Sequence, residues 1–239
     1  MNDGREPRVG LLLPQPHPVF ETALRVPDCG SRSDHGLSNE GLVLCHFDQA
    51  HKIGPEVFSI WMRLLGRVPD AVLWLLDAGP LANANLRHEA LARGIAPERL
   101  RFAPAVPYEA HLACLGHVDL FLDTFHHNAR SMAFNALWAG IPVVTYAGKT
   151  MASRLAGGFL RSLGLDELVL DSADDYERKA LELVTDPVAL ARVRNTLVAA
   201  RGHAAAFDAT ARVRAVERGF IKMVERQRAG LPPATLSVD

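Results

Sequence analysis

The chain has 239 residues, 49% of them hydrophobic, and a formal net charge of −1 at pH 7. This length and composition predict one large packed domain, with or without appendages, and exclude a disordered chain. A charge near zero excludes nucleic-acid binding through bulk charge, although a small basic pocket for a phosphate stays possible.

The expected compartment follows from the cysteines and from the apolar runs. Cys29, Cys45 and Cys114 stand at unrelated spacings without a CxxC pair, which fits a reducing compartment rather than a disulfide framework. The apolar runs are too short for a membrane span, and residues 1–8 are polar and unlike a signal peptide. We therefore expect a cytoplasmic protein without membrane or nucleic-acid partners.

Along the chain, apolar runs of strand length alternate with segments of helical spacing. A short apolar run at 9–13 precedes a tract rich in Pro, Gly and Ser at 15–39, which predicts an irregular connector. The expected strands are 42–47, 71–76, 100–103, 118–122 and 142–145. The expected helices are 55–67, 83–93, 108–115, 131–139, 150–163, 174–184, 187–199 and 210–228.

This alternation predicts an α/β fold, a doubly wound Rossmann-like parallel sheet of about six strands with helices on both faces. The last three helices are expected to form an appendage. Ligands of such sheets bind at the carboxyl ends of the strands, where helix N-termini also point. The candidate site therefore lies in the loops 46–55, 77–83, 103–108, 122–131 and 145–150.

Several common catalytic motifs are absent from the sequence. Neither GxGxxG nor GxxxxGK[ST] occurs, so a dinucleotide oxidoreductase or a P-loop enzyme would lack its phosphate-binding turn. No nucleophile elbow is present, and the histidines do not have the spacing of a metal-binding helix.

Three polar loops remain as candidates. In 47–53, Lys52 near a helix start could hold an anion, or it could be a solvated loop lysine. In 103–111, prolines hold an extended backbone beside Tyr108 and His111, which could contact a base or form a plain helix start. In 122–145, the amides of 129–132 could bind a diphosphate, or they could open an ordinary capped helix.

Many colinear strings, which run from about residue 32 to 233, resemble the C-terminal catalytic lobe of the O-GlcNAc transferases and their SPINDLY-like relatives. They include Lys52-Ile53-x-Pro55, Val72-Leu73-Trp74-Leu75-Leu76, Asp119-x-Phe121-Leu122-Asp123-Thr124, Leu137-Trp138-Ala139-Gly140-x-Pro142-Val143-Val144-Thr145, Ala152-Ser153-Arg154 and Gly230-Leu231-Pro232-Pro233. The resemblance implies the C-terminal lobe of a GT-B glycosyltransferase. It implies residues 1–39 as an irregular N-terminal connector, 40–200 as the nucleotide-sugar-binding lobe, and 201–239 as a C-terminal helix and tail.

The resemblance also implies roles for single residues. Lys52 would neutralise the diphosphate leaving group as the catalytic residue of this lobe. The other implied positions would bind the donor: Gln49 as a donor contact, the Val106 backbone and the His111 ring with Tyr108 at the uracil, Arg130, Ser131 and Met132 at the diphosphate, and Asn135 at the ribose.

The sequence departs from the family pattern at four places. Arg130-Ser131-Met132 replaces a His-Thr-Thr run and keeps one hydroxyl of the usual pair. Asn135 replaces an aspartate and lacks its charge, and Tyr108 replaces a lysine. In addition, Asp48 stands where the family commonly has an asparagine. These departures weaken the expected donor binding.

The implied function is the donor-binding lobe of an inverting O-glycosyltransferase that transfers a UDP-sugar, UDP-GlcNAc by resemblance, to protein Ser or Thr. No metal or other cofactor is expected. The acceptor would be bound by a first lobe or a tetratricopeptide region, which the resemblance places before these residues, so the chain alone is expected to be inactive. The alternatives are a degenerate, non-catalytic nucleotide-binding or interaction module and another GT-B enzyme, such as a UDP-sugar epimerase.

Overall fold

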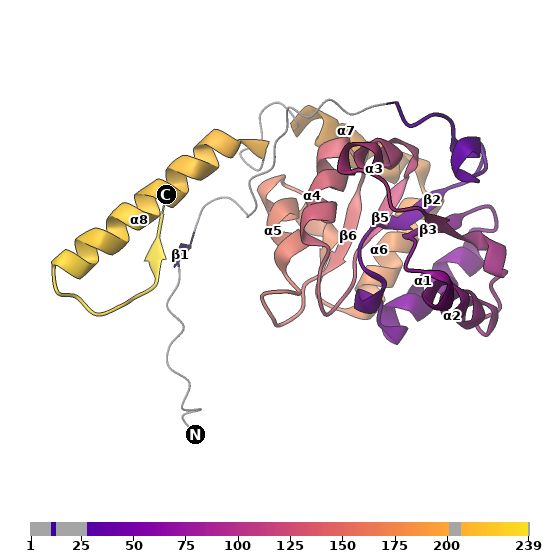
Figure 1. The fold of residues 1–239 in the computed structure, drawn as a ribbon, viewed down its shortest axis with the longest axis horizontal. Coiled ribbons are helices and arrows are strands. Elements are labelled where there is room, and N and C mark those ends of the chain that lie inside the picture. The colour runs from indigo at the N-terminus through magenta and orange to yellow at the C-terminus, as the bar shows by residue number, and fades with distance from the viewer. Residues whose placement is uncertain (1–10, 13–27, 201–206, 239) are drawn as a thin grey trace, which may run out of the picture.

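The computed structural model describes residues 11–12, 28–200 and 207–238. Six parallel strands form its central sheet (Figure 1), and the strands are β2 (Val43–His46), β3 (Val72–Leu76), β4 (Leu100–Ala103), β5 (Leu120–Leu122), β6 (Val143–Tyr146) and β7 (Val169–Leu170). The strand order is β4-β3-β2-β5-β6-β7. Successive strands are therefore added toward one edge of the sheet from β2 to β4 and toward the other edge from β5 to β7, and the order reverses between β2 and β5. Sheets of this kind bind ligands at that reversal point. The predicted Rossmann-like fold is confirmed.

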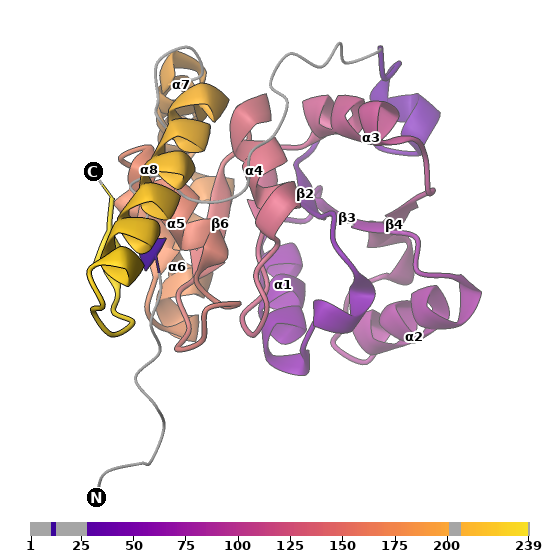
Figure 2. The same cartoon turned by 60° about the vertical axis from the view of Figure 1, so that its left-hand side comes forward.

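Helices cover both faces of the sheet, as right-handed crossovers require. The main helices are α1 (Pro55–Arg67), α2 (Pro80–Leu91), α3 (Tyr108–Cys114), α4 (Arg130–Ala139), α5 (Leu155–Ser162), α6 (Ala173–Thr185), α7 (Pro187–Ala200) and α8 (Ala209–Arg228). α1, α2 and α6 lie on one face and α3, α4 and α5 on the other (Figures 1 and 2). Both layers therefore send loops to the carboxyl edge of the sheet.

The predicted elements agree with the structure where local signals are strong. α1 begins at Pro55, whose missing N–H has no partner to lose in a first helical turn. α4 ends at Gly140, which has a φ of 84° and the left-handed conformation that glycine tolerates. α2 begins three residues before the predicted start, at Pro80.

The second half of the sheet differs from the prediction in two places. The helix expected at 150–163 begins only at Leu155, because Thr150 and Ser153 close a turn in which their hydroxyl oxygens lie 2.9 Å apart. The short strand β7 was not predicted, since its two residues carry no periodicity. β7 pairs with β6 and completes the sixth strand.

The prediction that the last three helices form an appendage is wrong for α6 and α7. α6 packs on the sheet through Tyr176, which is fully buried. The hydroxyl of Tyr176 donates to the carbonyl of Asp123 at 3.0 Å and accepts from the indole of Trp61 at 3.1 Å. α7 contacts α4 and α6. An apolar helical face next to an exposed sheet gains more free energy by covering the sheet than by leaving it.

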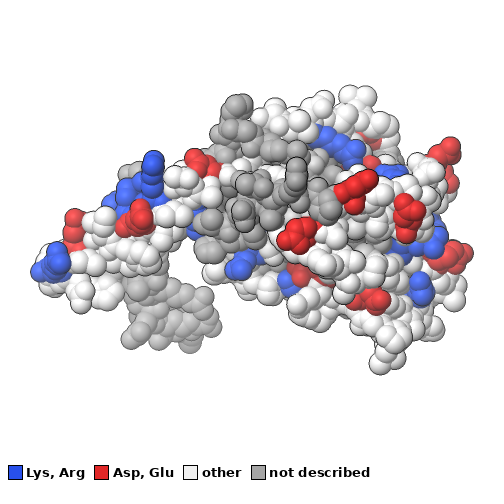
Figure 3. Space-filling model, turned by 45° about the horizontal axis from the view of Figure 1, so that its top comes forward, with Lys and Arg blue, Asp and Glu red and all other residues white. Residues whose placement is uncertain are grey.

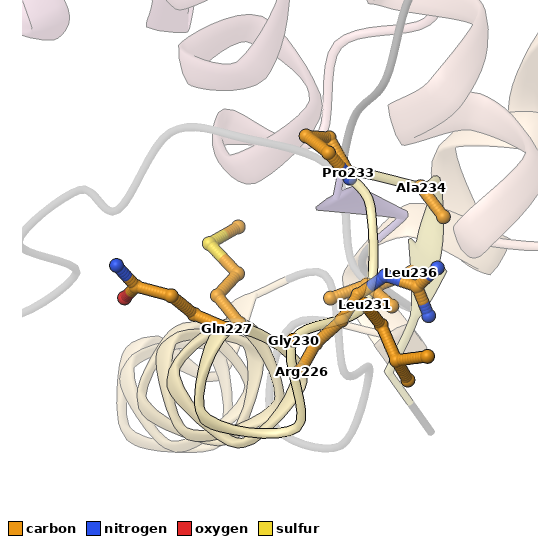
Figure 4. Close-up of a pocket in the computed structure, with 8 residues that line it drawn as sticks. Arg226, Gln227, Gly230, Leu231, Pro233, Ala234 and Leu236 are labelled. Carbon is orange, nitrogen blue, oxygen red and sulfur yellow. The ribbon is translucent and has the colours of Figure 1, made fainter.

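The last helix, α8, lies beside the rest of the fold, together with a two-stranded parallel pair of β1 (Leu11–Leu12) and β8 (Leu236–Ser237) (Figure 2). A cavity of about 620 Å³ opens between the end of α8 and the segment that returns to β8 (Figure 4). The rest of the predicted 9–13 run lies outside the described residues.

The surface agrees with the small net charge. On the face in Figure 3, basic and acidic side chains are interspersed. None of the helices in the described ranges is long and apolar enough to cross a membrane.

Candidate functional site

A cavity of about 420 Å³ opens at the carboxyl ends of β2, β3 and β4, beside the starts of α3 and α4. Five of the nine predicted site residues line it, and they are Gln49, Val106, Tyr108, His111 and Met132. They come from the three loops that the sequence singled out. Lys52, Arg130, Ser131 and Asn135 do not line this cavity, and their positions are described below.

Val106, Tyr108 and His111 form one end of the cavity, which we call the base end. Val106 lies in the extended stretch after β4, and Tyr108 opens α3. The ring of His111 packs against the ring of Phe47 with centroids 4.9 Å apart. Burial lowers the pKa of His111, so its imidazole is neutral near pH 7. This end presents rings and an extended backbone to the cavity.

The Nε2 atom of His111 is buried and has no hydrogen-bond partner among the residues that the structure describes. Buried polar atoms are normally paired, and an unpaired one in a cavity wall is a feature that a ligand can satisfy. A neutral imidazole can donate or accept at this atom, depending on its tautomer. The base end therefore has a polar atom available for a planar heterocycle.

Lys52 and Asp48 form an ion pair in the loop after β2. The ammonium Nζ of Lys52 lies 2.6 Å from Oδ2 of Asp48, and both side chains are largely buried, with exposed fractions of 12% and 13%. Asp48 lines the cavity, and Lys52 contacts Asp48 without lining the cavity itself. The lysine thus stands one side chain away from the cavity, and the carboxylate that holds it there opposes the approach of an anion.

The start of α4 is fixed by the buried carboxylate of Asp123. Its Oδ1 accepts from the amides of Thr124 at 2.9 Å and Ala129 at 2.7 Å, and its Oδ2 accepts from the hydroxyl of Thr145 at 2.6 Å. Burial raises the pKa of Asp123 to about 7, against the lowering effect of these three donors. The interpretation that the Ala129 amide is open to a diphosphate is therefore wrong.

The next three amides of α4 remain available to a ligand. Those of Arg130, Ser131 and Met132 have no acceptor within the described part of the chain. The side chains of Arg130 and Ser131 likewise form no hydrogen bond or ion pair with the described residues, and Arg130 is exposed. A helix start with unpaired amides and an exposed guanidinium favours an anion. We call this region, together with Lys52, the diphosphate end.

Asn135 joins the two ends of the site. Its Oδ1 accepts from the hydroxyl of Tyr108 at 3.0 Å, and its Nδ2 lies 3.7 Å from the sulfur of Met132. Asn135 is buried, so the contact links α3 to α4 beneath the cavity. A sugar hydroxyl would have to displace Tyr108 to reach this amide.

Three residues near the cavity were not singled out, although they lie in the predicted loops 46–55 and 77–83. The motif search did not select Phe47 or Asp77, which line the cavity. His46 ends β2 fully buried, and burial lowers its pKa to about 4. His46 and Phe47 have the apolar surroundings of strand residues in the sequence. Only their position at the carboxyl end of β2 could have indicated that they lie near a ligand site.

A second cavity, of about 520 Å³, lies at the carboxyl ends of β5, β6 and β7. It is lined by residues that include His126, Tyr146, Lys149, Ser153 and Asp171. The predicted loop 145–150 therefore reaches the carboxyl edge, as expected, but it lines a different cavity from the one lined by five of the predicted site residues.

Comparison with known proteins gives a family match over residues 18–216, to the model described as glycosyl transferase family 41. The sequence is 31% identical over 208 residues to a probable UDP-N-acetylglucosamine–peptide N-acetylglucosaminyltransferase of Arabidopsis thaliana, named SEC. It is also 31% identical over 226 residues to a UDP-N-acetylglucosamine–peptide N-acetylglucosaminyltransferase of Caenorhabditis elegans. These matches cover 87% and 93% of the chain, but only 21% and 20% of the two relatives.

Solved structures give a matching result. An O-GlcNAc transferase mutant from Thermobaculum terrenum superimposes with a TM-score of 0.70 at 30% identity, over 83% of this chain and 40% of that one. The UDP-GlcNAc 2-epimerase of Neisseria meningitidis matches with a TM-score of 0.52 at 10% identity, over 80% of this chain and 47% of that one, which is a likeness of fold alone. The chain spans about one fifth of the curated relatives named above.

Proposed function

This chain belongs to glycosyl transferase family 41, and we propose that residues 40–200 form the donor-binding lobe of an inverting O-glycosyltransferase that uses UDP-GlcNAc. Membership confirms the resemblance found in the sequence. The proposed acceptors are Ser and Thr hydroxyls of proteins, and the names of the two relatives specify a peptide acceptor. The UDP-sugar is a substrate here, and the proposal includes no metal or other cofactor in transfer.

The observation that carries this proposal is the cavity at the carboxyl ends of β2, β3 and β4. Five residues that the resemblance assigned to donor binding line it, although they come from three separate segments of the chain. A chance match of short strings would not bring them to one cavity. The reversal in strand order beside β2 also places this cavity where α/β sheets hold nucleotides.

In the proposed complex, uracil lies at the base end. The backbone beside Val106 pairs with the edge of the base, while His111 offers its unpaired Nε2 atom and Tyr108 offers its ring. Neutral ring systems that stack on a base and donate to its edge suit a pyrimidine.

The diphosphate lies between Lys52 and the first turn of α4. During transfer, the bond between the anomeric carbon and the diphosphate breaks, and negative charge develops on the departing UDP. The Lys52 ammonium, the Arg130 guanidinium and the amides of residues 130–132 stabilise that charge. Lys52 is thus the residue of this lobe that acts on the reacting atoms.

The acceptor is proposed to be positioned by protein outside these residues. The relatives are about five times as long as the matched segment, and only a fraction of them can be represented here. The exposed side of α8 carries apolar side chains that suit a protein contact: Val213, Phe220, Ile221, Met223 and Val224.

A second candidate function, a non-catalytic nucleotide-binding or interaction module, is favoured by one specific contact. Asp48 holds Lys52 at 2.6 Å and brings its own negative charge to the cavity wall. A site built to bind a diphosphate gains nothing from that charge. On this alternative, the cavity binds uridine and UDP equally, or neither.

Titration calorimetry of UDP into the chain and into Lys52→Ala tests the proposal. We expect the wild type to bind UDP and the variant to lose about 1.5–3 kcal/mol of binding free energy, the size of a charge-assisted hydrogen bond. Lys179→Ala is a matched control, because Lys179 is also paired, with Glu182 at 2.7 Å, and lies on α6 away from the cavity. Equal UDP affinity in wild type and Lys52→Ala would remove Lys52 from the site, and absence of UDP binding in both would favour the second candidate.

A further inference from the structure

Four side chains with metal-binding atoms meet at the opposite end of α3 from the cavity. Cys29 and His35 come from the segment around the short 3-10 helix η1 (Arg32–His35), Cys114 ends α3, and His117 ends the 3-10 helix η4 (Leu115–His117). The two pairs lie about 80 residues apart in sequence, and neither pair has a familiar metal-site spacing by itself. Only the fold brings them together.

The distances between these atoms are short. The sulfur of Cys29 lies 3.1 Å from Nε2 of His35 and 3.3 Å from the sulfur of Cys114. Ligand atoms of Cys29, His35 and His117 lie within 4.8 Å of one another. Cys114 is outside this group of three and joins it through its contact with Cys29. In a tetrahedral zinc site, bond lengths of about 2.0–2.3 Å place neighbouring ligand atoms about 3.3–3.8 Å apart. The cluster is therefore close to the size of a zinc site.

A second observation points to a ligand at this place. The Nε2 atom of His117 is buried and has no hydrogen-bond partner within the described ranges. Its ring faces that of His35 with centroids 5.3 Å apart. Both cysteines are free thiols. Two thiols and two imidazoles, with one buried ring nitrogen unpaired, form the donor set that zinc prefers in structural sites.

The surroundings hold the two segments in place independently of these four side chains. The guanidinium of Arg32 donates to the carbonyls of Gly41 and His117, each at 2.9 Å, and to the carboxylate of Asp119 at 2.8 Å. This bridge links η1 to the end of η4. The backbone is thus arranged before any metal binds, which lowers the ordering cost of binding.

We propose that Cys29, His35, Cys114 and His117 bind one Zn²⁺ ion in a structural site. Binding releases the protons of the two thiols to solvent, and each sulfur and each imidazole nitrogen then donates an electron pair to the metal. His35 gives up its 2.8 Å contact with the carbonyl of Cys29 to take part. The four ligands fill the tetrahedron, so the ion has no open position for catalysis.

The site would connect the N-terminal segment to the base end of the cavity. α3 carries Cys114 one helical turn after His111, so an ion that fixes Cys114 also fixes the helix that presents His111. The role is structural and does not depend on whether the cavity binds UDP. The zinc proposal can therefore be tested independently of the proposed function.

Cobalt substitution tests the zinc site directly in the full chain. The protein is reduced, stripped of metal with a chelator, and titrated with Co²⁺ under exclusion of air. We expect saturation at about one ion per chain, with a thiolate-to-cobalt charge-transfer band in the near ultraviolet and tetrahedral d–d bands in the visible range. Added Zn²⁺ should abolish both sets of bands.

Single variants assign the ligands. Cys114→Ser, at a buried position, should lose about half of the charge-transfer intensity or all cobalt binding. Cys29→Ser should have the same effect, and because Cys29 is partly exposed this variant leaves the packing of the core unchanged. His88→Ala replaces an exposed histidine of α2 and should bind cobalt like the wild type. Far-ultraviolet circular dichroism checks that each variant is folded.

Two results would overturn the proposal. The first is reduced, folded wild type that develops no charge-transfer band with excess Co²⁺. The second is a Cys29–Cys114 disulfide, seen as a mass two hydrogens lower in protein purified without reductant and without metal added, together with no zinc in the same sample by elemental analysis.

Discussion

The base end and the diphosphate end of the candidate site differ in how many of their groups are free to bind a ligand. At the base end, Val106, Tyr108 and His111 all line the cavity, and His111 keeps an unpaired buried nitrogen. At the diphosphate end, Lys52 is paired with Asp48, and the Ala129 amide is bonded to Asp123. The base end is therefore arranged for a ligand, while part of the diphosphate end is occupied by the protein's own groups.

It follows that the position of a site in a fold and the charges available in that site are independent of each other. The sheet brings the loops together whatever their side chains are, because backbone topology sets where the strands end. Anion binding depends instead on which cations and amides stay unpaired. Binding of the nucleoside and binding of the diphosphate are thus separable properties, and each prediction below changes one of them.

The largest expected effect concerns transfer itself. A polypeptide of these 239 residues, mixed with UDP-GlcNAc and a Ser/Thr-rich peptide, should give no glycosylated peptide by mass spectrometry. In the proposed function both ends of the site bind the donor and neither binds the acceptor. Holding an acceptor beside a donor can supply about 7–11 kcal/mol of a barrier. Turnover above that of Lys52→Ala would contradict this account.

The second effect concerns the anchor of the diphosphate end. Asp123→Ala should destabilise the fold by about 3 kcal/mol or more, because each buried donor left unpaired costs about 1–3 kcal/mol. Urea denaturation followed by tryptophan fluorescence gives the change in the free energy of unfolding. Asp123→Asn is the matched control, since its amide can still accept from both backbone amides and donate to Thr145. Equal losses in the two variants would contradict the anchoring role.

The same carboxyl predicts a pH dependence of stability. Its pKa in the folded protein is about 7, above the ordinary value of 3.8. The folded state therefore binds the proton of the Asp123 carboxyl more tightly than the unfolded state does. Protonation of Asp123 stabilises the fold fully below about pH 4, and this stabilisation is lost as the pH rises to about 7. Asp123→Asn should lack this part of the pH dependence of unfolding between pH 4 and 7. Parallel pH curves for wild type and Asp123→Asn would contradict the raised pKa.

A smaller effect is expected at the base end. His111→Ala should weaken uridine and UDP equally, by about 1–2 kcal/mol, the size of one hydrogen bond and part of a stacking contact. Lys52→Ala, in contrast, should weaken UDP and leave uridine unchanged. Because the pKa of His111 lies below its ordinary value, affinity for uridine should stay constant between pH 7 and 8. A loss confined to UDP in His111→Ala would place the base elsewhere.

The smallest effect concerns the ion pair of the diphosphate end. Asp48→Asn removes a negative charge beside the proposed diphosphate and frees Lys52, so affinity for UDP should rise about three- to tenfold, while uridine binding stays unchanged. Glu182→Gln, which breaks the comparable pair with Lys179 on α6, is the control. Calorimetry at low and high salt checks the effect, which should shrink as salt increases. Unchanged UDP affinity in Asp48→Asn at low salt would contradict the repulsion.

The sequence predicted the sheet and the location of the site because both follow from local signals. Apolar runs, Pro55 and Gly140 define strands and helix ends residue by residue. The strand ends then select the loops that line the cavity. The packing of α6 on the sheet was not predicted, because it depends on residues distant in sequence, as in the contact of Tyr176 with Trp61.

The same reason explains what the site analysis could not predict. Lys52 pairs with Asp48, and Tyr108 pairs with Asn135. Both contacts depend on the side-chain rotamers in the folded protein, which the sequence does not specify. The Cys and His cluster joins segments about 80 residues apart and has no spacing to reveal it. Three-dimensional coordinates were required for each of these contacts.

The most direct test of the central claim, that a nucleoside diphosphate binds at the carboxyl edge of this sheet, is a map of amide chemical shifts. Spectra of the isotope-labelled chain are recorded during titration with UDP. We expect saturable shifts at the amides beside Val106 and at residues 130–132, where the structure leaves amides unpaired. Shifts confined to the cavity between α8 and β8, or no shifts with excess UDP, would contradict it.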